Sequence, residues 1–204
     1  MIKKIDSTKE IIVSKGAKIR LDDTNIVITR GMLEYYEEEF KVKISDEVFD
    51  FYSKMNGIEY DWELEKEQLN GFINIHSFGE MIENETEGKL WVDWYEEDDI
   101  EEIKKHRIFE TIIGADYYIT IKFDADGSYK LYYVPEGSVN HGGSKKLDEI
   151  PLTIEQYLNV ISTFYFCYEI RHHLHKKELY ENPKSVLKNL EKFEIVFGEI
   201  KLEL

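Results

Sequence analysis

The sequence predicts an α+β fold: a mainly antiparallel, twisted sheet flanked by helices, with a helical extension at residues 163–204. Residues 108–134 are rich in aromatic and β-branched residues and contain the turn sequence Asp-Ala-Asp-Gly at 124–127, which is typical of a β-hairpin. Elsewhere, apolar residues recur at helical spacing. The 204 residues, 42% hydrophobic and 14% aromatic, suffice for one domain with a packed core.

The first 28 residues are expected to form short strands. Residues 10–13 and 18–21 are rich in β-branched and aliphatic side chains, and the turn residues Ser-Lys-Gly at 14–16 separate them. Residues 26–28 fit either a further strand or a lead-in to the next element. We therefore predict strands before the first helix.

Two helices should follow. Leu33, Tyr36 and Phe40 share one helical face, which predicts the first helix. Ser45 is a candidate N-cap for the second, because a serine side chain can accept a hydrogen bond from a free amide of the first turn. That second helix is expected to end at Asn56-Gly57, residue types that tolerate a left-handed backbone.

The remaining elements are predicted from the same signals. Residues 71–75 alternate as a half-buried strand does, and Ser77 can cap a short helix. Thr153 should cap a long helix that continues through Tyr168. Asn182-Pro183 is expected to start a short helix, and residues 194–204 look like a closing strand.

The net charge of −16 comes from one segment. Residues 31–110 hold 24 of the 42 acidic residues and 8 of the 26 basic ones, whereas the remainder holds 18 of each. Such a field repels nucleic acid and anionic lipid, and it favours a basic protein partner. The alternative is that the acidity only keeps the protein soluble.

The stretch around residues 91–102 is the predicted partner-binding site. Six acidic residues occupy seven positions at 96–102, directly after aromatic residues of the kind that anchor interfaces. Trp91 and Trp94 are three residues apart, so at least one of them is expected on the buried face of a helix. The predicted binding residues are Trp94, Tyr95, Glu96, Glu97, Asp98 and Asp99.

We expect no cofactor and no metal. The turn at 124–127 resembles the start of a calcium loop, but Pro135 stands at the twelfth position, where that loop needs a glutamate. His141 lies in a turn-rich loop without a second ligand at metal spacing. The histidines His172, His173 and His175 fall near a helix C-terminus, which the helix dipole favours. Cys167, the single cysteine, is expected to be a buried thiol.

The N-terminal residues MIKKIDSTKE lack the apolar core of a secretory signal, and no window reaches the roughly 20 apolar residues that span a bilayer. The sequence therefore predicts a cytoplasmic protein with no membrane partner.

Several segments in order resemble the SUKH superfamily, which includes the yeast Smi/Knr-type cell-wall-synthesis regulators and many bacterial proteins. The resemblance rests on short motifs, and it covers about residues 26–162, the core of the single predicted domain 1–204. The motifs are Ser45-Asp46-Glu47 before residues 48–52, the stop at Met55-Asn56-Gly57, the strand 71–75, the hairpin with Asp126-Gly127 and the helix start at 152–158.

The resemblance implies an α+β fold, no enzymatic activity and a binding role. Bacterial members are implied to act as immunity proteins that neutralise toxins, often nucleases, in competition between cells. We therefore expect a non-catalytic protein-binding module that neutralises a basic, nuclease-type toxin through an acidic face. One alternative is an intracellular regulatory or scaffold protein of the cell-wall-synthesis-regulator kind. A hydrolase with two catalytic carboxylates is another, but a sequence with 42 acidic residues cannot nominate the pair.

Overall fold

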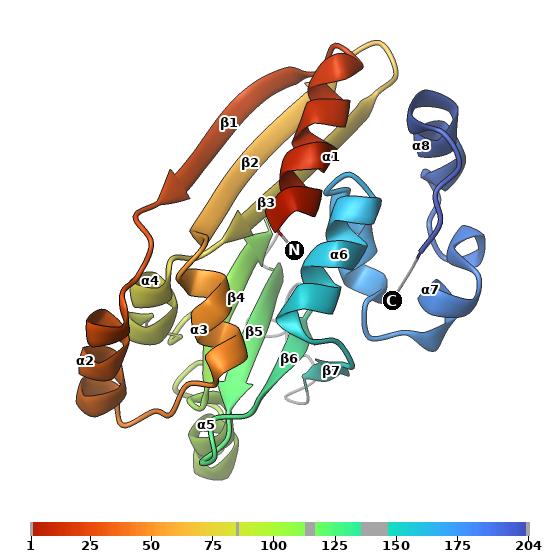
Figure 1. Cartoon of the computed structure of the whole chain (residues 1–204). Helices are drawn as coiled ribbons and strands as arrows, with labels where there is room; N and C mark the ends of the chain where they lie inside the picture. Colours follow the sequence, from red (N-terminus) through yellow and green to blue (C-terminus); the bar gives the residue numbers. More distant parts are fainter. Residues whose placement is uncertain (1, 85, 113–116, 136–146, 203–204) are drawn as a thin grey trace. The chain divides into compact units, whose positions relative to one another are not determined.

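The computed structural model describes residues 2–84, 86–112, 117–135 and 147–202 (Figure 1). Its centre is a seven-stranded antiparallel sheet whose strand order equals the chain order. This confirms the predicted α+β class. The strands are β1 (Lys18–Asn25), β2 (Asn56–Leu64), β3 (Leu69–Ile75), β4 (His106–Ile112), β5 (Tyr117–Phe123), β6 (Tyr129–Val134) and β7 (Asp148–Ile150).

Helices precede, interrupt and follow these strands. None of the helices within the described ranges combines the length and apolar character that a membrane crossing requires. They are α1 (Ile2–Ser14), α2 (Arg30–Phe40), α3 (Asp46–Tyr52), α4 (Phe78–Glu83), α5 (Glu97–Ile103), α6 (Ile154–Thr163), α7 (Lys177–Glu181) and α8 (Leu190–Phe197), with 3₁₀ turns at η1 (Tyr168–His173) and η2 (Pro183–Ser185).

The chain divides into two compact units, each assembled from segments that are distant in the sequence. Unit 1 comprises Met1–Asp23, Glu59–Ile73 and Pro151–Leu204, and unit 2 comprises Thr24–Ile58 and Asn74–Ile150. The predicted acidic binding site lies in unit 2.

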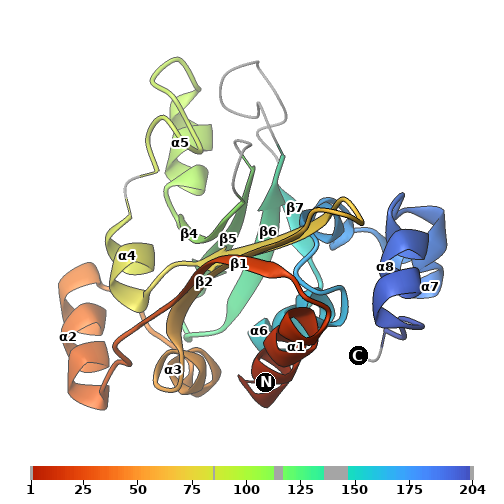
Figure 2. The same ribbon diagram turned by 90° about the horizontal axis from the view of Figure 1, so that it is seen from above.

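In unit 2, the strands β4, β5 and β6 carry helices on both faces. Adjacent residues of a strand point to opposite faces. The Phe109 ring lies 6.2 Å from that of Phe51 in α3, whereas Ile108 packs in a cluster with Tyr95 and Ile103 beside α5. Figure 2 accordingly shows α3 on one side of these strands and α5 on the other.

Asn56 and Gly57 begin strand β2 instead of ending a helix, because α3 already stops at Tyr52. The buried Asn56 amide donates to the Ile26 carbonyl at 2.6 Å and accepts from the Phe78 backbone N–H at 2.7 Å. Gly57 has φ 84°, and a Cβ there would come within 2.8 Å of the Ile75 carbonyl oxygen. The predicted helix end was wrong, but both residues have specific structural roles.

In unit 1, α6 ends at Thr163, before the basic run at 171–177 where the helix was predicted to end. Tyr165 and Phe166 adopt left-handed φ values of 53° and 59°, and their amides donate to Ser162 and Ile161. This is the Schellman pattern that closes a helix, normally built with glycine at the first left-handed position. Because no glycine stands at this position, local residue types do not indicate that the helix ends here.

The carbonyls that follow this turn are bound by three donors. The Trp62 indole donates to Tyr165 at 2.9 Å, and the Phe72 amide donates to Phe166 at 2.8 Å. The Arg171 guanidinium, fully buried, donates to the carbonyls of Phe166, Cys167 and Phe72 at 2.8–3.0 Å. The turn after α6 is thus joined to β2 and β3.

The structure corrects the predictions at both ends of the chain. Residues 10–13 belong to helix α1, whose buried residues Ile5, Thr8 and Ile12 follow a helical period. Residues 26–28 form no regular element, and residues 194–197 belong to α8. The β-branched run in α1 suggested a strand, but packing overrides such propensities.

Other local predictions are confirmed. Ser45, Ser77 and Thr153 each accept a hydrogen bond as N-caps of α3, α4 and α6, the last two in capping boxes. Residues 124–127 turn the chain between β5 and β6. Cys167 is buried, and burial raises the pKa of its thiol to about 11.

Replacing Arg171 should destabilise unit 1. Arg171→Leu removes the three hydrogen bonds that the guanidinium donates to buried carbonyls, so the free energy of unfolding should fall by about 3 kcal/mol or more. Urea unfolding measures the difference. The exposed Lys177→Leu, which also removes a positive charge from unit 1, should change stability by less than about 0.5 kcal/mol. Equal effects of the two substitutions would contradict the role assigned to Arg171.

Candidate protein-binding surface

The predicted binding site lies on and just before α5, where one aromatic residue is buried and another exposed. The Tyr95 side chain is 8% exposed and packs with Leu90, Ile103, Ile108 and Val134. It therefore holds the segment on the sheet and does not present an anchor to a partner. The Trp94 side chain is 67% exposed.

Trp91 is a structural residue of the same segment, although it does not lie on a helix as predicted. Its indole donates to the Thr86 hydroxyl at 3.1 Å, and the Lys104 ammonium lies 4.7 Å from the ring centroid. The half-buried ring also packs against the Tyr95 cluster. Of the two tryptophans, Trp94 is the one available to a partner.

The acidic residues occupy the N-terminal end of α5. Glu96 is the N-cap residue, and Glu97, Asp98 and Asp99 form the first turn. The free amides and the dipole of a helix N-terminus favour negative charge. This placement offsets part of the repulsion between neighbouring carboxylates, which explains how so dense an acidic run can sit in a regular element.

One acidic residue of the run ties α5 to the sheet. Glu102 pairs with Lys122 of β5 and, at 2.8 Å, with Lys105. These two hydrogen-bonded lysines lower the pKa of the Glu102 carboxyl to about 2. Among the described residues, by contrast, Glu96, Glu97, Asp98 and Glu101 form no ion pair. These four residues and Trp94 are called the α5 surface below.

His106, at the start of β4, lies directly after α5 and is buried. Its Nδ1 is 3.1 Å from the Thr120 hydroxyl, and its ring meets Tyr132 edge to face at 4.7 Å between centroids. Burial, aided by the nearby Lys122 charge, lowers the pKa of His106 to about 4. The imidazole is therefore neutral near pH 7, and it supports the sheet surface beside α5.

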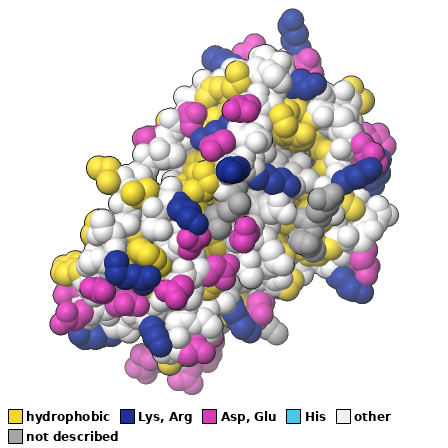
Figure 3. All heavy atoms as spheres, in the orientation of Figure 1, with side chains coloured by type: hydrophobic (Ala, Val, Ile, Leu, Met, Phe, Trp, Pro, Cys, Tyr) yellow, Lys and Arg dark blue, Asp and Glu magenta, His cyan; other side chains and the backbone are white. Residues whose placement is uncertain are grey.

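Acidic residues are concentrated in unit 2, but they lie in two places. Unit 2 holds 25 acidic and 12 basic residues, a charge of −13, whereas unit 1 holds 17 and 14, a charge of −3. Figure 3 shows carboxylates over α2 and around α5. Figure 2 draws these two helices apart from each other, so the carboxylates form two groups, one on α2 and one on α5.

Sequence reasoning missed several exposed apolar residues on α2, the second acidic surface, and shortly before it in the chain. Ile26, Val27, Met32 and Tyr35 are all exposed, and the acidic Glu34 and Glu38 lie beside them in sequence on α2. The helical spacing of α2 does predict the exposure of two of these residues. Leu33, Tyr36 and Phe40 define the inner face of α2, so Met32 and Tyr35 had to point elsewhere.

The positions considered for metal binding have other structural roles. In the turn at 124–127, the Asp126 carboxylate accepts from the Ser128 amide and hydroxyl at 2.9 and 2.7 Å. Burial lowers the pKa values of His172 and His173. Within the described ranges, no three His, Cys, Asp or Glu side chains are arranged to hold a metal ion. His141 lies outside those ranges.

No family model matches the chain, and neither a curated protein nor a solved structure matches it. The SUKH resemblance therefore stays a prediction, and the functional argument depends on the geometry of the α5 surface.

Acidification should weaken the fold through His106. Its pKa is about 4 when folded and near 6.5 when unfolded, so between these values the unfolded chain binds the extra proton. The stabilisation is complete above pH 6.5 and declines as the pH falls toward 4. From pH 7 to 5 this group should reduce the free energy of unfolding by about 2 kcal/mol.

Urea unfolding of the parent protein and of His106→Gln at both pH values measures this contribution. Glutamine does not titrate and can still bond Thr120, so the variant should lose less stability on acidification. His76, His172 and His173 also have lowered pKa values, and they are common to both proteins. Identical pH dependence in the two proteins would exclude His106 as the source.

Proposed function

We propose that this chain is a non-catalytic immunity protein that neutralises a basic, nuclease-type toxin through the α5 surface. One observation carries the proposal. The exposed Trp94 precedes α5, and four carboxylates at the start of α5 and on it have no cationic partner among the described residues. The helix itself is fixed to the sheet. The SUKH resemblance supports the same class of function. It supplies the toxin as the expected partner.

The chemistry of a nuclease explains why this surface would fit one. A nuclease must be cationic where it holds the phosphate backbone. Closely spaced carboxylates can occupy that groove in place of the nucleic acid, while their field accelerates association with the basic partner. Exposed tryptophans are enriched among residues that dominate binding energy. Trp94 would supply the apolar contact, and the acidic residues would supply the charged rim.

The α5 surface is also held in place before any partner arrives. Tyr95 and Ile103 pack into the cluster on the sheet, and Glu102 pairs with Lys122. A surface that is already ordered loses less conformational entropy on binding. This favours a role in recognition over a purely solubilising role, for which such fixation is unnecessary.

The first test uses the toxin domain expected from the reading frame beside this chain's gene. The triple variant Glu96→Gln/Glu97→Gln/Asp98→Asn should slow association with that domain about tenfold or more at low salt, because it removes local steering charge. Stopped-flow fluorescence measures the rate. Asp99 is left unchanged, because it already interacts within the protein.

The matched control is Glu34→Gln/Glu38→Gln/Glu39→Gln on α2, which alters the net charge by the same amount at the other acidic surface. Its effect on the rate should be clearly smaller. Equal slowing by both variants would show that only net charge matters, and unchanged affinity of the first variant would remove the proposed site. An adjacent frame without a toxic product would contradict the immunity function.

The second test concerns the apolar anchor. Trp94→Ala should weaken binding to the same toxin domain by about 2 kcal/mol, a typical loss for an aromatic hot spot. It should leave the unfolding midpoint nearly unchanged, because the side chain is mostly exposed. Calorimetric titration gives the affinity. Tyr35→Ala, which removes an aromatic ring of similar exposure on α2, is the control. A greater loss with Tyr35→Ala would move the binding site to α2.

A further inference from the structure

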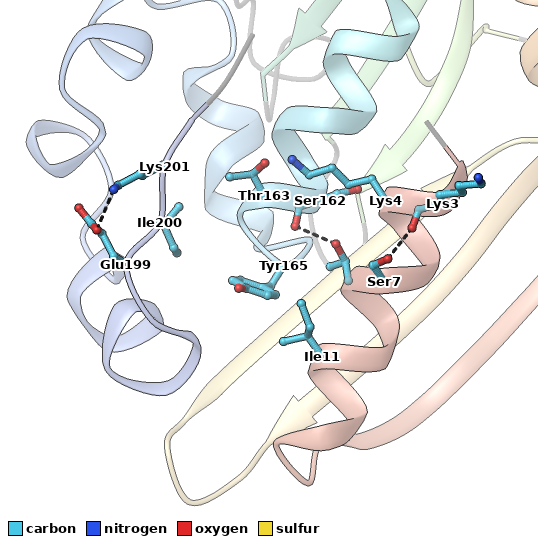
Figure 4. A pocket seen from close by; sticks show the side chains of 11 residues that line it. Lys3, Lys4, Ser7, Ile11, Ser162, Thr163, Tyr165, Glu199, Ile200 and Lys201 are labelled. Atoms are coloured by element: carbon cyan, nitrogen blue, oxygen red, sulfur yellow. Dashed lines mark hydrogen bonds and ion pairs between the residues drawn. The ribbon is translucent and has the colours of Figure 1, made fainter.

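Unit 1 contains a cavity of about 650 Å³ between α1, the end of α6 and the C-terminal segment (Figure 4). This volume falls within the range of small-molecule sites. Its apolar walls are Ile11, Ile200 and the ring of Tyr165, which stacks on Phe197 at 3.9 Å between centroids. The polar lining residues are Lys3, Lys4, Ser7, Thr8, Ser162, Thr163, Glu199 and Lys201.

The charge around this cavity is opposite to that of the protein. Among the described residues, three lysines and one glutamate line it, although the chain carries a net charge of −16. Glu199 and Lys201 pair at 3.1 Å, so the remaining lining charge is positive. Figure 4 shows Lys4 reaching toward Thr163, while Lys3 extends away. A positive site in an acidic protein favours an anionic ligand.

Three hydroxyl protons of the lining are already committed. Ser7 donates to the Lys3 carbonyl at 2.8 Å, Thr8 to the Ser162 carbonyl at 3.4 Å, and Thr163 to the Asn159 carbonyl at 2.8 Å. Each of these oxygens keeps acceptor capacity. The lysine ammonium groups and the Tyr165 hydroxyl remain as donors, so the lining can both donate to an anion and accept from hydroxyl groups.

Ser162 is a second, independent indication of a ligand. It lines the cavity, it is 1% exposed, and its hydroxyl has no hydrogen-bond partner among the residues that the structure describes. A buried polar group without a partner is destabilising, and most such groups in folded proteins are satisfied. A ligand that enters the cavity can supply the missing hydrogen bond.

From these features we infer that the unit 1 cavity binds a small organic anion that carries a phosphate or carboxylate group together with hydroxyl groups. Lys4 binds the anionic group, the threonine and serine oxygens accept from the ligand hydroxyls, and Tyr165 and Ile200 cover its apolar side. The inference does not depend on the proposed function, because the α5 surface belongs to unit 2.

The test is a titration of the full chain followed by heteronuclear NMR, with glycerol 3-phosphate, glycerate and neutral glycerol as probes. The two anions should shift the amide signals of Thr163 and Tyr165 in a saturable way, whereas glycerol should not. The anion that binds with the higher affinity identifies the preferred anionic group. Absence of saturable shifts with both anions, or equal binding of glycerol, would overturn the inference.

Paired variants separate a built site from general electrostatics. Lys4→Gln should weaken binding of the preferred anion about tenfold or more, because it removes the charged donor that reaches toward Thr163. The control Lys15→Gln removes the same charge from an exposed residue outside the cavity, and it should have little effect. Equal weakening by both variants would overturn the inference. Thermal unfolding confirms that each variant is folded.

Discussion

The packing of unit 1 depends on hydrogen bonds to three backbone carbonyls that follow the end of α6. Helix termini leave carbonyls without intrahelical partners, and burying such groups unbonded is destabilising. Here the Trp62 indole, the Phe72 amide and the Arg171 guanidinium bind the carbonyls of residues 165–167. A Cβ on Gly71 would lie 2.4 Å from the Trp62 nitrogen, so the close approach requires glycine. The left-handed turn also sets the position of Tyr165 in the cavity.

In unit 2, the opposite facing of two adjacent β4 residues decides where the acidic helix lies. Phe109 faces α3, and its neighbour Ile108 faces Tyr95 and Ile103. A register slip of one residue would exchange these faces and release α5 from the sheet. The register shift in the β4–β5 pairing between Ile108 and Glu110 follows directly after this point. The α5 surface is therefore positioned by buried apolar contacts, and its charged residues are free to face solvent.

Local signals in the sequence predicted the elements that depend on local chemistry. Ser45, Ser77 and Thr153 were recognisable as caps because capping involves residues only three positions apart. Asn56 was misread, because its partners Ile26 and Phe78 are distant in the sequence. The end of α6 was missed because Tyr165 stands where glycine is usual. For the candidate site, composition located the acidic run, but only packing separates the buried Tyr95 from the exposed Trp94.

The electrostatics of α5 bear on binding as well as on folding. Glu96, Glu97 and Asp98 are consecutive, so their mutual repulsion raises the free energy of the unbound protein. The helix dipole offsets part of this repulsion, and the pairs of Glu102 with Lys122 and Lys105 hold the next turn. A cationic partner would gain its own attraction and also relieve the remaining repulsion. Salt at about 0.1–0.15 M screens mainly charges that are more than about 8–10 Å apart, so it relieves less of the repulsion between consecutive carboxylates. An ordered, unneutralised acidic turn is therefore more favourable in a complex with a basic protein than in the free state.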